Sequence, residues 1–197
     1  MPADNGSAAP VLLACTDAAG SAEILGATQR WLERAVIGLN LCPFAKGVVA
    51  RKQVRYALTV AATADQLLAE LEHELALLAS TAPDDLDTTL LIHPWAMTDF
   101  LDYHFFLGEV DALIRKLGHE GVFQVASLHP DYEFSGSAAD DIANFTNRSP
   151  YPMLHLLRES SIDRAVAAFP EAAEIFERNI ETMERLGHEG WRKLWLV

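Results

Sequence analysis

The sequence predicts an α/β fold: a small, mostly parallel sheet of about three strands, covered by helices and followed by a helical C-terminal region. Strand-like apolar runs at residues 54–60, 88–93 and 122–128 alternate with two segments whose apolar residues recur at helical spacing. A helix that connects two consecutive strands is typical of a parallel sheet. Hydrophobic residues make up 50% of the 197 residues, which suffices for one core and excludes a largely disordered chain.

The N-terminal part of the chain divides into a tail and a helix. Residues 1–20 are rich in Ala, Gly and Ser, and we expect them to be a mobile segment before a single α/β domain at residues 21–197. Apolar side chains at helical spacing predict a helix over residues 21–39. We expect this helix to stop at residues 40–43, because Pro43 disfavours the helical conformation in the residue before it.

The two helices between the predicted strands carry clear start signals. A capping box, in which Thr63 accepts a hydrogen bond from the Gln66 amide, starts the first. Thr98 or Asp99 caps the second. We expect this second helix to end at Gly118, because glycine readily takes the left-handed conformation that closes helices.

The C-terminal part begins with a long irregular segment. Residues 129–149 show no periodicity but contain several large apolar side chains, which predicts an ordered loop. Ser149 and Pro150 are typical of a helix N-cap and first helical position, so we expect a helix that runs to about residue 160. Two further helices, broken at Pro170, should follow. The last large apolar side chains are expected to pack onto the domain as an anchor: Trp191, Leu194 and Trp195.

Charge and hydropathy exclude several classes of protein. The 15 Lys and Arg residues against 28 Asp and Glu residues give a net charge of −13, which argues against a nucleic-acid partner. No apolar run approaches the ~20 residues that span a bilayer. Residues 1–9 lack the positive charge of a secretory signal, so we expect a cytoplasmic location and no membrane partner. Two cysteines, Cys15 and Cys42, are too few for a disulfide framework.

Two histidines mark the ends of predicted strands. His93 and His129 each follow an apolar strand and precede a proline. If these strands are parallel neighbours, both histidines lie at the carboxyl edge of the sheet, where open α/β sheets bind their ligands. This pattern predicts a functional edge. The alternative is that each histidine forms ordinary hydrogen bonds with loop backbone.

A second candidate site lies at the predicted helix start after the long loop. The free N–H groups at Ser149, beside Arg148, are typical of an anion site. On that helix, His155, Arg158 and Glu159 would share one face, because residues three and four apart are helix neighbours. The planar fork of arginine suits a carboxylate or phosphate. A helix cap beside a surface salt bridge is the alternative interpretation.

Cys42 admits three interpretations. A nucleophilic thiol needs a pKa lowered by a cation or a nearby histidine, and Lys46 lies four residues away. A buried free cysteine that acts as a small apolar residue is the second interpretation. Cys42 and two histidines are also possible metal ligands, although the spacings of these residues match no ligand motif.

Three stretches resemble a known family. They are Trp31-Leu32 with Leu-Asn-Leu-Cys-Pro-Phe-Ala at 39–45, the segment 123–130 that ends in His-Pro, and 144–159 with Asn-Phe-Thr-Asn-Arg-Ser-Pro-Tyr-Pro followed by Leu-His-Leu-Leu-Arg-Glu. These motifs are similar to those of the bacterial family known as the domain of unknown function 1415. The resemblance covers residues 25–185. It implies the extent of the domain and no known activity, cofactor or catalytic residue.

Our first hypothesis is an enzyme that acts on a small anionic metabolite. His129 is its candidate general acid/base, because an imidazole titrates near neutral pH, and Cys42 is a candidate nucleophile. The residues expected to orient or assist are His93, His155 and Asp131. The residues expected to hold the substrate are Arg148, Ser149, Arg158, Asn144, Asn147 and Tyr132. The alternatives are a non-catalytic ligand-binding or protein-interaction module and a His/Cys metal-binding protein. The cofactor and the oligomeric state stay open.

Overall fold

The computed structural model describes residues 18–168 and 174–195. Most of the segment expected to be mobile, and the expected break at Pro170, lie outside these described residues. From Ala18 onward the chain is helical, three residues before the predicted start of the domain. No helix within the described ranges combines the length and the apolar character needed to cross a membrane.

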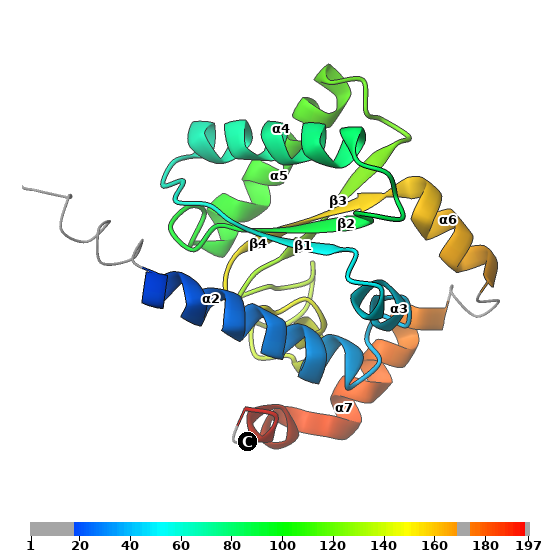
Figure 1. Ribbon diagram of the computed structural model, residues 1–197. Coiled ribbons are helices and arrows are strands. Elements are labelled where there is room, and N and C mark those ends of the chain that lie inside the picture. The colour runs from blue at the N-terminus through cyan, green and yellow to red at the C-terminus, as the bar shows by residue number, and fades with distance from the viewer. Residues whose placement is uncertain (1–17, 169–173, 196–197) are drawn as a thin grey trace, which may run out of the picture.

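The centre of the structure is a mixed sheet of four strands (Figure 1). The strands are β1 (Val54–Leu58), β2 (Thr88–Ile92), β3 (Phe123–Leu128) and β4 (Met153–Arg158), and their spatial order is β1-β2-β4-β3. The first pair is parallel, whereas β4 is antiparallel to both of its neighbours. The α/β class is therefore confirmed, but the three-stranded, mostly parallel sheet is not.

The predicted helix after Ser149 is wrong, because its residues form β4. The run Met153–Arg158 is rich in leucine, which has a high helix propensity. It is flanked by strands on both sides, however, and most of its side chains are buried on one or the other face of the sheet. Burial on both faces favours a central strand and overrides the local propensity. The helix begins later, as α6 (Glu159–Ala168).

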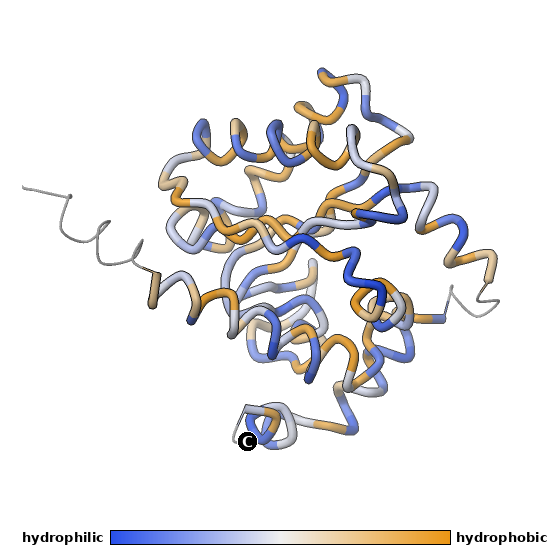
Figure 2. The backbone as a smooth tube through the Cα atoms, in the orientation of Figure 1, coloured by the Kyte–Doolittle hydropathy of each residue, from blue (hydrophilic) through white to orange (hydrophobic). Residues whose placement is uncertain are grey.

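Helices α4 (Ala64–Ser80) and α5 (Phe100–Lys116) cover one face of the sheet (Figure 1). The predicted caps are confirmed: Thr63 accepts from the Gln66 amide, and Asp99 accepts from two amides of α5. The residues of α4 that are completely buried against the sheet are Leu67, Leu71, Leu75 and Leu78. Figure 2 shows apolar segments gathered along the sheet and on the inner sides of the helices.

The opposite face is covered by α2 (Ala18–Trp31), α3 (Ala45–Ala50) and α7 (Ile175–Lys193) (Figure 1). After Trp31 the helix continues as a π-helical segment, Leu32–Ile37. Within α7, Gly187 has φ 63°, a left-handed value that kinks the helix. Two predicted anchors pack against the core on this face, which confirms that part of the prediction: Trp191 and Leu194.

Arg158, at the end of β4, closes the C-terminus of α4. Its guanidinium donates hydrogen bonds to the carbonyl oxygens of Leu78, Thr81 and Leu86. These carbonyls lie at or beyond the last turn of α4, where helical partners run out and the helix dipole favours a cation. Arg158 is 8% exposed, and its charge stabilises the C-terminal end of α4.

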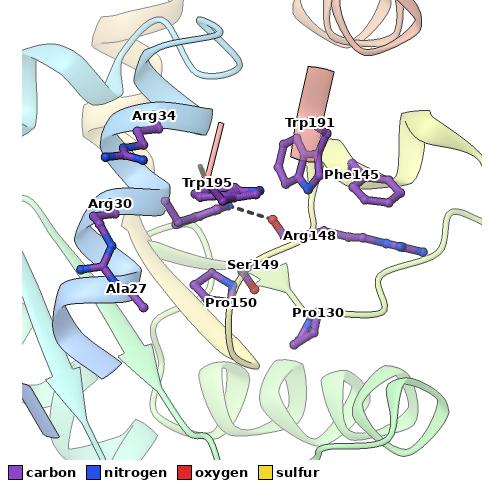
Figure 3. Close-up of a pocket in the computed structure, with 11 residues that line it drawn as sticks. Ala27, Arg30, Arg34, Pro130, Phe145, Arg148, Ser149, Pro150, Trp191 and Trp195 are labelled. Carbon is purple, nitrogen blue, oxygen red and sulfur yellow. Dashed lines mark hydrogen bonds between the residues drawn. The ribbon is translucent and has the colours of Figure 1, made fainter. Parts of the chain in front are cut away.

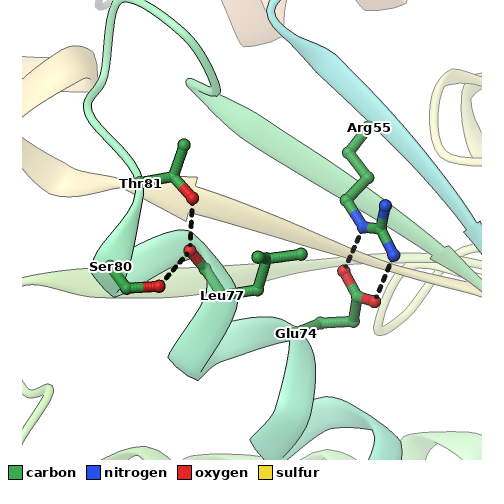
Figure 4. Close-up of polar contacts among 5 residues, drawn as sticks. All are labelled: Arg55, Glu74, Leu77, Ser80 and Thr81. Atoms are coloured by element: carbon green, nitrogen blue, oxygen red, sulfur yellow. Dashed lines mark hydrogen bonds and ion pairs between the residues drawn. The ribbon is translucent and has the colours of Figure 1, made fainter.

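An ion pair ties α4 to the edge strand β1 (Figure 4). Arg55 contacts both carboxylate oxygens of Glu74, at 2.7 and 3.0 Å. The Glu74 side chain is only 4% exposed, whereas that of Arg55 is 42% exposed. The hydrogen bond to Glu74 raises the pKa of Arg55. The buried carboxylate therefore depends on one partly exposed guanidinium for its counter-charge.

Replacing Arg55 should destabilise the protein more than removing the whole pair. Arg55→Met leaves a buried carboxylate without a cation, and we expect a loss of about 2 kcal/mol in the free energy of unfolding. The double variant Arg55→Met/Glu74→Met should recover most of this loss. Chemical denaturation measures both, with Arg115→Met on the exposed side of α5 as the control. Equal losses in the single and double variants would contradict this account.

Candidate functional site

Two cavities lie on the α2 side of the sheet, and they share Trp31 as a wall. The larger, of about 770 Å³, lies against the sheet itself. The smaller, of about 390 Å³, lies among α2, the β3–β4 loop and the end of α7 (Figure 3). The residues of the sheet that line the larger cavity are Val54, Thr88, Leu90, Gln124, Ala126, Leu128, His155, Leu157 and Arg158.

The alternation of β4 directs His155 into the larger cavity. Leu154 and Leu156 belong to the core beneath α4 and α5, so His155 between them faces the opposite side of the sheet. The Arg158 guanidinium, three residues further, bonds to the C-terminal end of α4, although Arg158 is also among the residues that border the cavity. The predicted grouping of His155 with Arg158 and Glu159 on one helix face is therefore wrong, since residues three apart in a strand point to opposite faces.

Hydrogen bonds fix the tautomer of His155. The Thr88 hydroxyl donates its proton to the carbonyl oxygen of Leu156 at 2.6 Å. The Thr88 oxygen therefore accepts from His155 Nε2–H, 2.8 Å away. This leaves Nδ1 with a lone pair and no hydrogen-bond partner among the described residues. His155 lines the larger cavity, so Nδ1 is the ring nitrogen left to accept a hydrogen bond from a molecule bound there.

Burial keeps the His155 ring neutral. The surroundings are mostly apolar, and burial lowers the pKa of His155 to about 4. The neutral imidazole donates its Nε2 proton to Thr88, so at neutral pH its Nδ1 is a hydrogen-bond acceptor on the cavity side.

The structure brings His93 and His129 to the same edge of the sheet, as the sequence suggested. They follow β2 and β3, which run in the same direction although β4 lies between them. The Tyr103 ring packs against both imidazoles, with centroid distances of 5.8 Å to His93 and 5.1 Å to His129. Both histidines are fully buried, and neither lines either cavity.

Most of the ring nitrogens of His93 and His129 form hydrogen bonds with backbone groups. His129 Nδ1 accepts from the Asp131 amide, and its Nε2 donates to the Met97 carbonyl oxygen. His93 Nδ1 donates to Ala96 O at 2.9 Å, which leaves Nε2 buried and without a partner. Burial lowers the pKa of both rings, that of His93 to about 4. In this geometry His93 and His129 hold the loops at the sheet edge by hydrogen bonds to their backbone.

Several of the residues expected to bind substrate hold the β3–β4 loop together. Asn144 is fully buried and bonds to Phe134, Ser137 and Ala138. The Tyr132 carbonyl accepts from Arg148. The Ser149 amide, in place of opening a helix, donates to His129 O at 3.4 Å. The expected cluster of free amides at a helix start is therefore not formed here, because residues 149–152 lead into a strand.

The remaining candidates divide between the two cavities. Arg148 and Ser149 line the smaller one. Cys42, Asn147, His155 and Arg158 line the larger one. Among the described residues, no group of three or more His, Cys, Asp or Glu side chains is arranged to hold a metal ion.

The sequence patterns do not reveal Thr88 as the partner of His155 or Trp31 as a wall of both cavities. Thr88 was recognised only as a strand start, and its importance depends on its pairing with β4. Trp31 was recognised as one of the apolar residues of a helix. Its indole N–H donates to the Arg148 carbonyl at 2.8 Å, a contact between segments 117 residues apart that no local pattern signals.

Comparison with known proteins gives one match. The model of a family described as "Protein of unknown function (DUF1415)" matches residues 23–193 of the chain. No curated protein and no solved structure matches it.

Acid should destabilise the fold through its buried neutral histidines. The pKa of His93 is about 4 in the folded protein and about 6.5 when unfolded, so the unfolded state binds more protons between these values. Stability is therefore lost as the pH falls from about 6.5 to 4, by on the order of 3 kcal/mol for His93. His93→Asn keeps a donor towards Ala96 and should flatten this dependence in denaturation experiments. His73→Asn, on the exposed side of α4, is the control, and an unchanged slope in His93→Asn would refute the assignment.

Proposed function

The chain belongs to the DUF1415 family of proteins of unknown function, and from its own geometry we propose that it binds a small, largely apolar molecule in the larger cavity. His155 is the polar anchor, and its Nδ1 accepts a hydrogen bond from the ligand. The observation that carries this proposal is the free, oriented lone pair of a neutral imidazole in an apolar cavity.

The dimensions and lining of the cavity support this proposal. Ligand sites in proteins typically have volumes of roughly 300–1,000 Å³ and an apolar lining with a few placed polar groups. Here the cavity measures about 770 Å³. Leucine, valine and alanine side chains make up much of the cavity lining. An apolar ligand body with one N–H or O–H donor complements this arrangement.

The polar end of the cavity limits the orientation of the ligand. Ser161 donates to Asp87, and Arg164 donates to Ser161. These groups are thus bonded to one another, and an apolar molecule has few polar atoms to offer them. The ligand should therefore place its donor at His155 and its apolar body against the sheet and the π-helical segment.

The low pKa of His155 favours binding over acid/base catalysis. A general acid or base works best when its pKa lies near the working pH. With a pKa of about 4, the imidazole is almost never protonated at neutral pH and is a weak base. It is nevertheless a competent hydrogen-bond acceptor, since that role requires only the neutral ring.

A fluorescent probe tests the binding proposal. N-phenyl-1-naphthylamine has an apolar body and one N–H donor, and its emission rises in apolar surroundings. Ala126 pairs with His155 across the sheet, so Ala126→Phe should fill the cavity and abolish probe binding. His155→Leu should weaken binding by up to about tenfold, the worth of one hydrogen bond. His73→Leu is the matched control. Unchanged binding in Ala126→Phe would show that the probe lies elsewhere and refute the proposal.

One observation favours a second candidate function, an enzyme with a thiol nucleophile. Cys42 lines the same cavity as His155, whose free lone pair is a possible acceptor for the thiol proton. This candidate replaces His129 by His155 as the base, because both nitrogens of His129 are engaged by backbone.

Ester hydrolysis tests this second candidate. The thiolate would attack the carbonyl of p-nitrophenyl acetate, release nitrophenolate and leave a thioester that water cleaves. We expect Cys42→Ala and His155→Leu each to lower kcat by at least about 100-fold. Cys15→Ala is the control for unspecific thiol reactivity. Equal rates in the wild type and in Cys42→Ala would eliminate this candidate.

A further inference from the structure

The smaller cavity combines aromatic walls with positive charge. Its aromatic lining residues are Trp31, Phe145, Trp191 and Trp195, and its charged lining residues are Arg30, Arg34 and Arg148. Among the residues that the structure describes, none of those that line this cavity is acidic. The protein has a net charge of −13, whereas three arginines give this small cavity a positive charge.

Two of the three arginines keep donors available. Arg30 is exposed and forms no hydrogen bond or ion pair within the described part of the chain, and Arg34 donates to a single carbonyl, that of Leu194. Arg148 is committed to the fold. It donates to the carbonyls of Tyr132 and Ala139, and its guanidinium lies 4.1 Å from the centre of the Phe145 ring. Figure 3 shows its guanidinium directed away from Arg30 and Arg34. Arg30 on α2 and Arg34 on the π-helical segment are therefore the cations open to a ligand.

The aromatic side chains offer rigid ring surfaces. Trp191 lies edge-on to Phe145, with centroids 5.4 Å apart, and edge-on to Trp195 at 5.5 Å. The indole N–H of Trp31 is bonded to the Arg148 carbonyl, which fixes its ring on the β3–β4 loop. A planar ligand ring gains most from such walls, because aromatic pairs add to the energy of apolar burial.

We propose that the smaller cavity is a second binding site, for a planar aromatic anion. The ring of the ligand lies among the tryptophans, and its carboxylate or phosphate group pairs with the guanidinium groups of Arg30 and Arg34. Guanidinium pairs with either group through two parallel hydrogen bonds. This site is separate from the larger cavity, and the proposal does not depend on what that cavity binds.

Calorimetric titration with 2-naphthoate, 2-naphthyl phosphate and neutral 2-naphthalenemethanol tests the proposal and separates carboxylate from phosphate. We expect the anions to bind at least about tenfold more tightly than the alcohol. Arg30→Met should weaken anion binding about fivefold, and Arg30→Met/Arg34→Met more, while Arg115→Met leaves it unchanged. The charges of Glu23 and Arg30 both act on the pKa of Tyr151, so Glu23 lies in the same region as Arg30. Glu23→Gln removes a negative charge there and should leave anion binding equal or tighter. Equal affinity for anion and alcohol, or for wild type and Arg30→Met, would overturn the proposal.

The tryptophans also report where the ligand binds. Three of the four tryptophans line this cavity, and the fourth, Trp95, does not. In ¹⁵N–¹H spectra, naphthoate should move the indole signals of Trp31, Trp191 and Trp195 and leave that of Trp95 in place. Ala126→Phe, which fills the larger cavity, should not alter naphthoate binding. A loss of naphthoate binding in Ala126→Phe would place the ligand in the larger cavity and refute a second site.

Discussion

The structure depends on the pairing of β4 with two other strands at once. This strand lies between β2 and β3 and is antiparallel to both, so its backbone groups find partners on each side. Without it, β3 has no neighbour in the sheet. The same strand directs His155 into the larger cavity and Arg158 onto the end of α4. One six-residue segment thus connects the core, the cap of a helix and the candidate site.

The sequence was most informative where local chemistry decides the structure. The caps at Thr63 and Asp99 and the helix end at Gly118 follow from local rules, and the structure agrees with them. It failed at β4. A leucine-rich segment after a serine and a proline satisfies the local rules for a helix, and only its neighbours in the sheet decide otherwise.

The error at β4 explains which parts of the site could be anticipated. His155 is a candidate from the sequence and lines the larger cavity, but its expected companions, Arg158 and Glu159, depended on helical spacing. Its actual partner is Thr88, which lies 67 residues away and meets it only through strand pairing. The sequence predicted an anion site beside Arg148, whereas the arginines with donors available at the smaller cavity are Arg30 on α2 and Arg34 on the π-helical segment. Contacts between distant segments were the information that the sequence patterns lacked.

The order of the strands in the chain also has a consequence for folding during synthesis. The parallel pair β1–β2 is complete once residue 92 has emerged, but β2 and β3 cannot be joined until the ribosome has added Met153–Arg158. Until then one edge of β2 and both edges of β3 remain without partners, and such edges invite pairing with other chains. The nascent chain therefore carries an open, aggregation-prone sheet through the whole synthesis of the β3–β4 loop. The arrival of β4 pairs the open edge of β2 and one edge of β3 in a single step, and the other edge of β3 remains the border of the sheet.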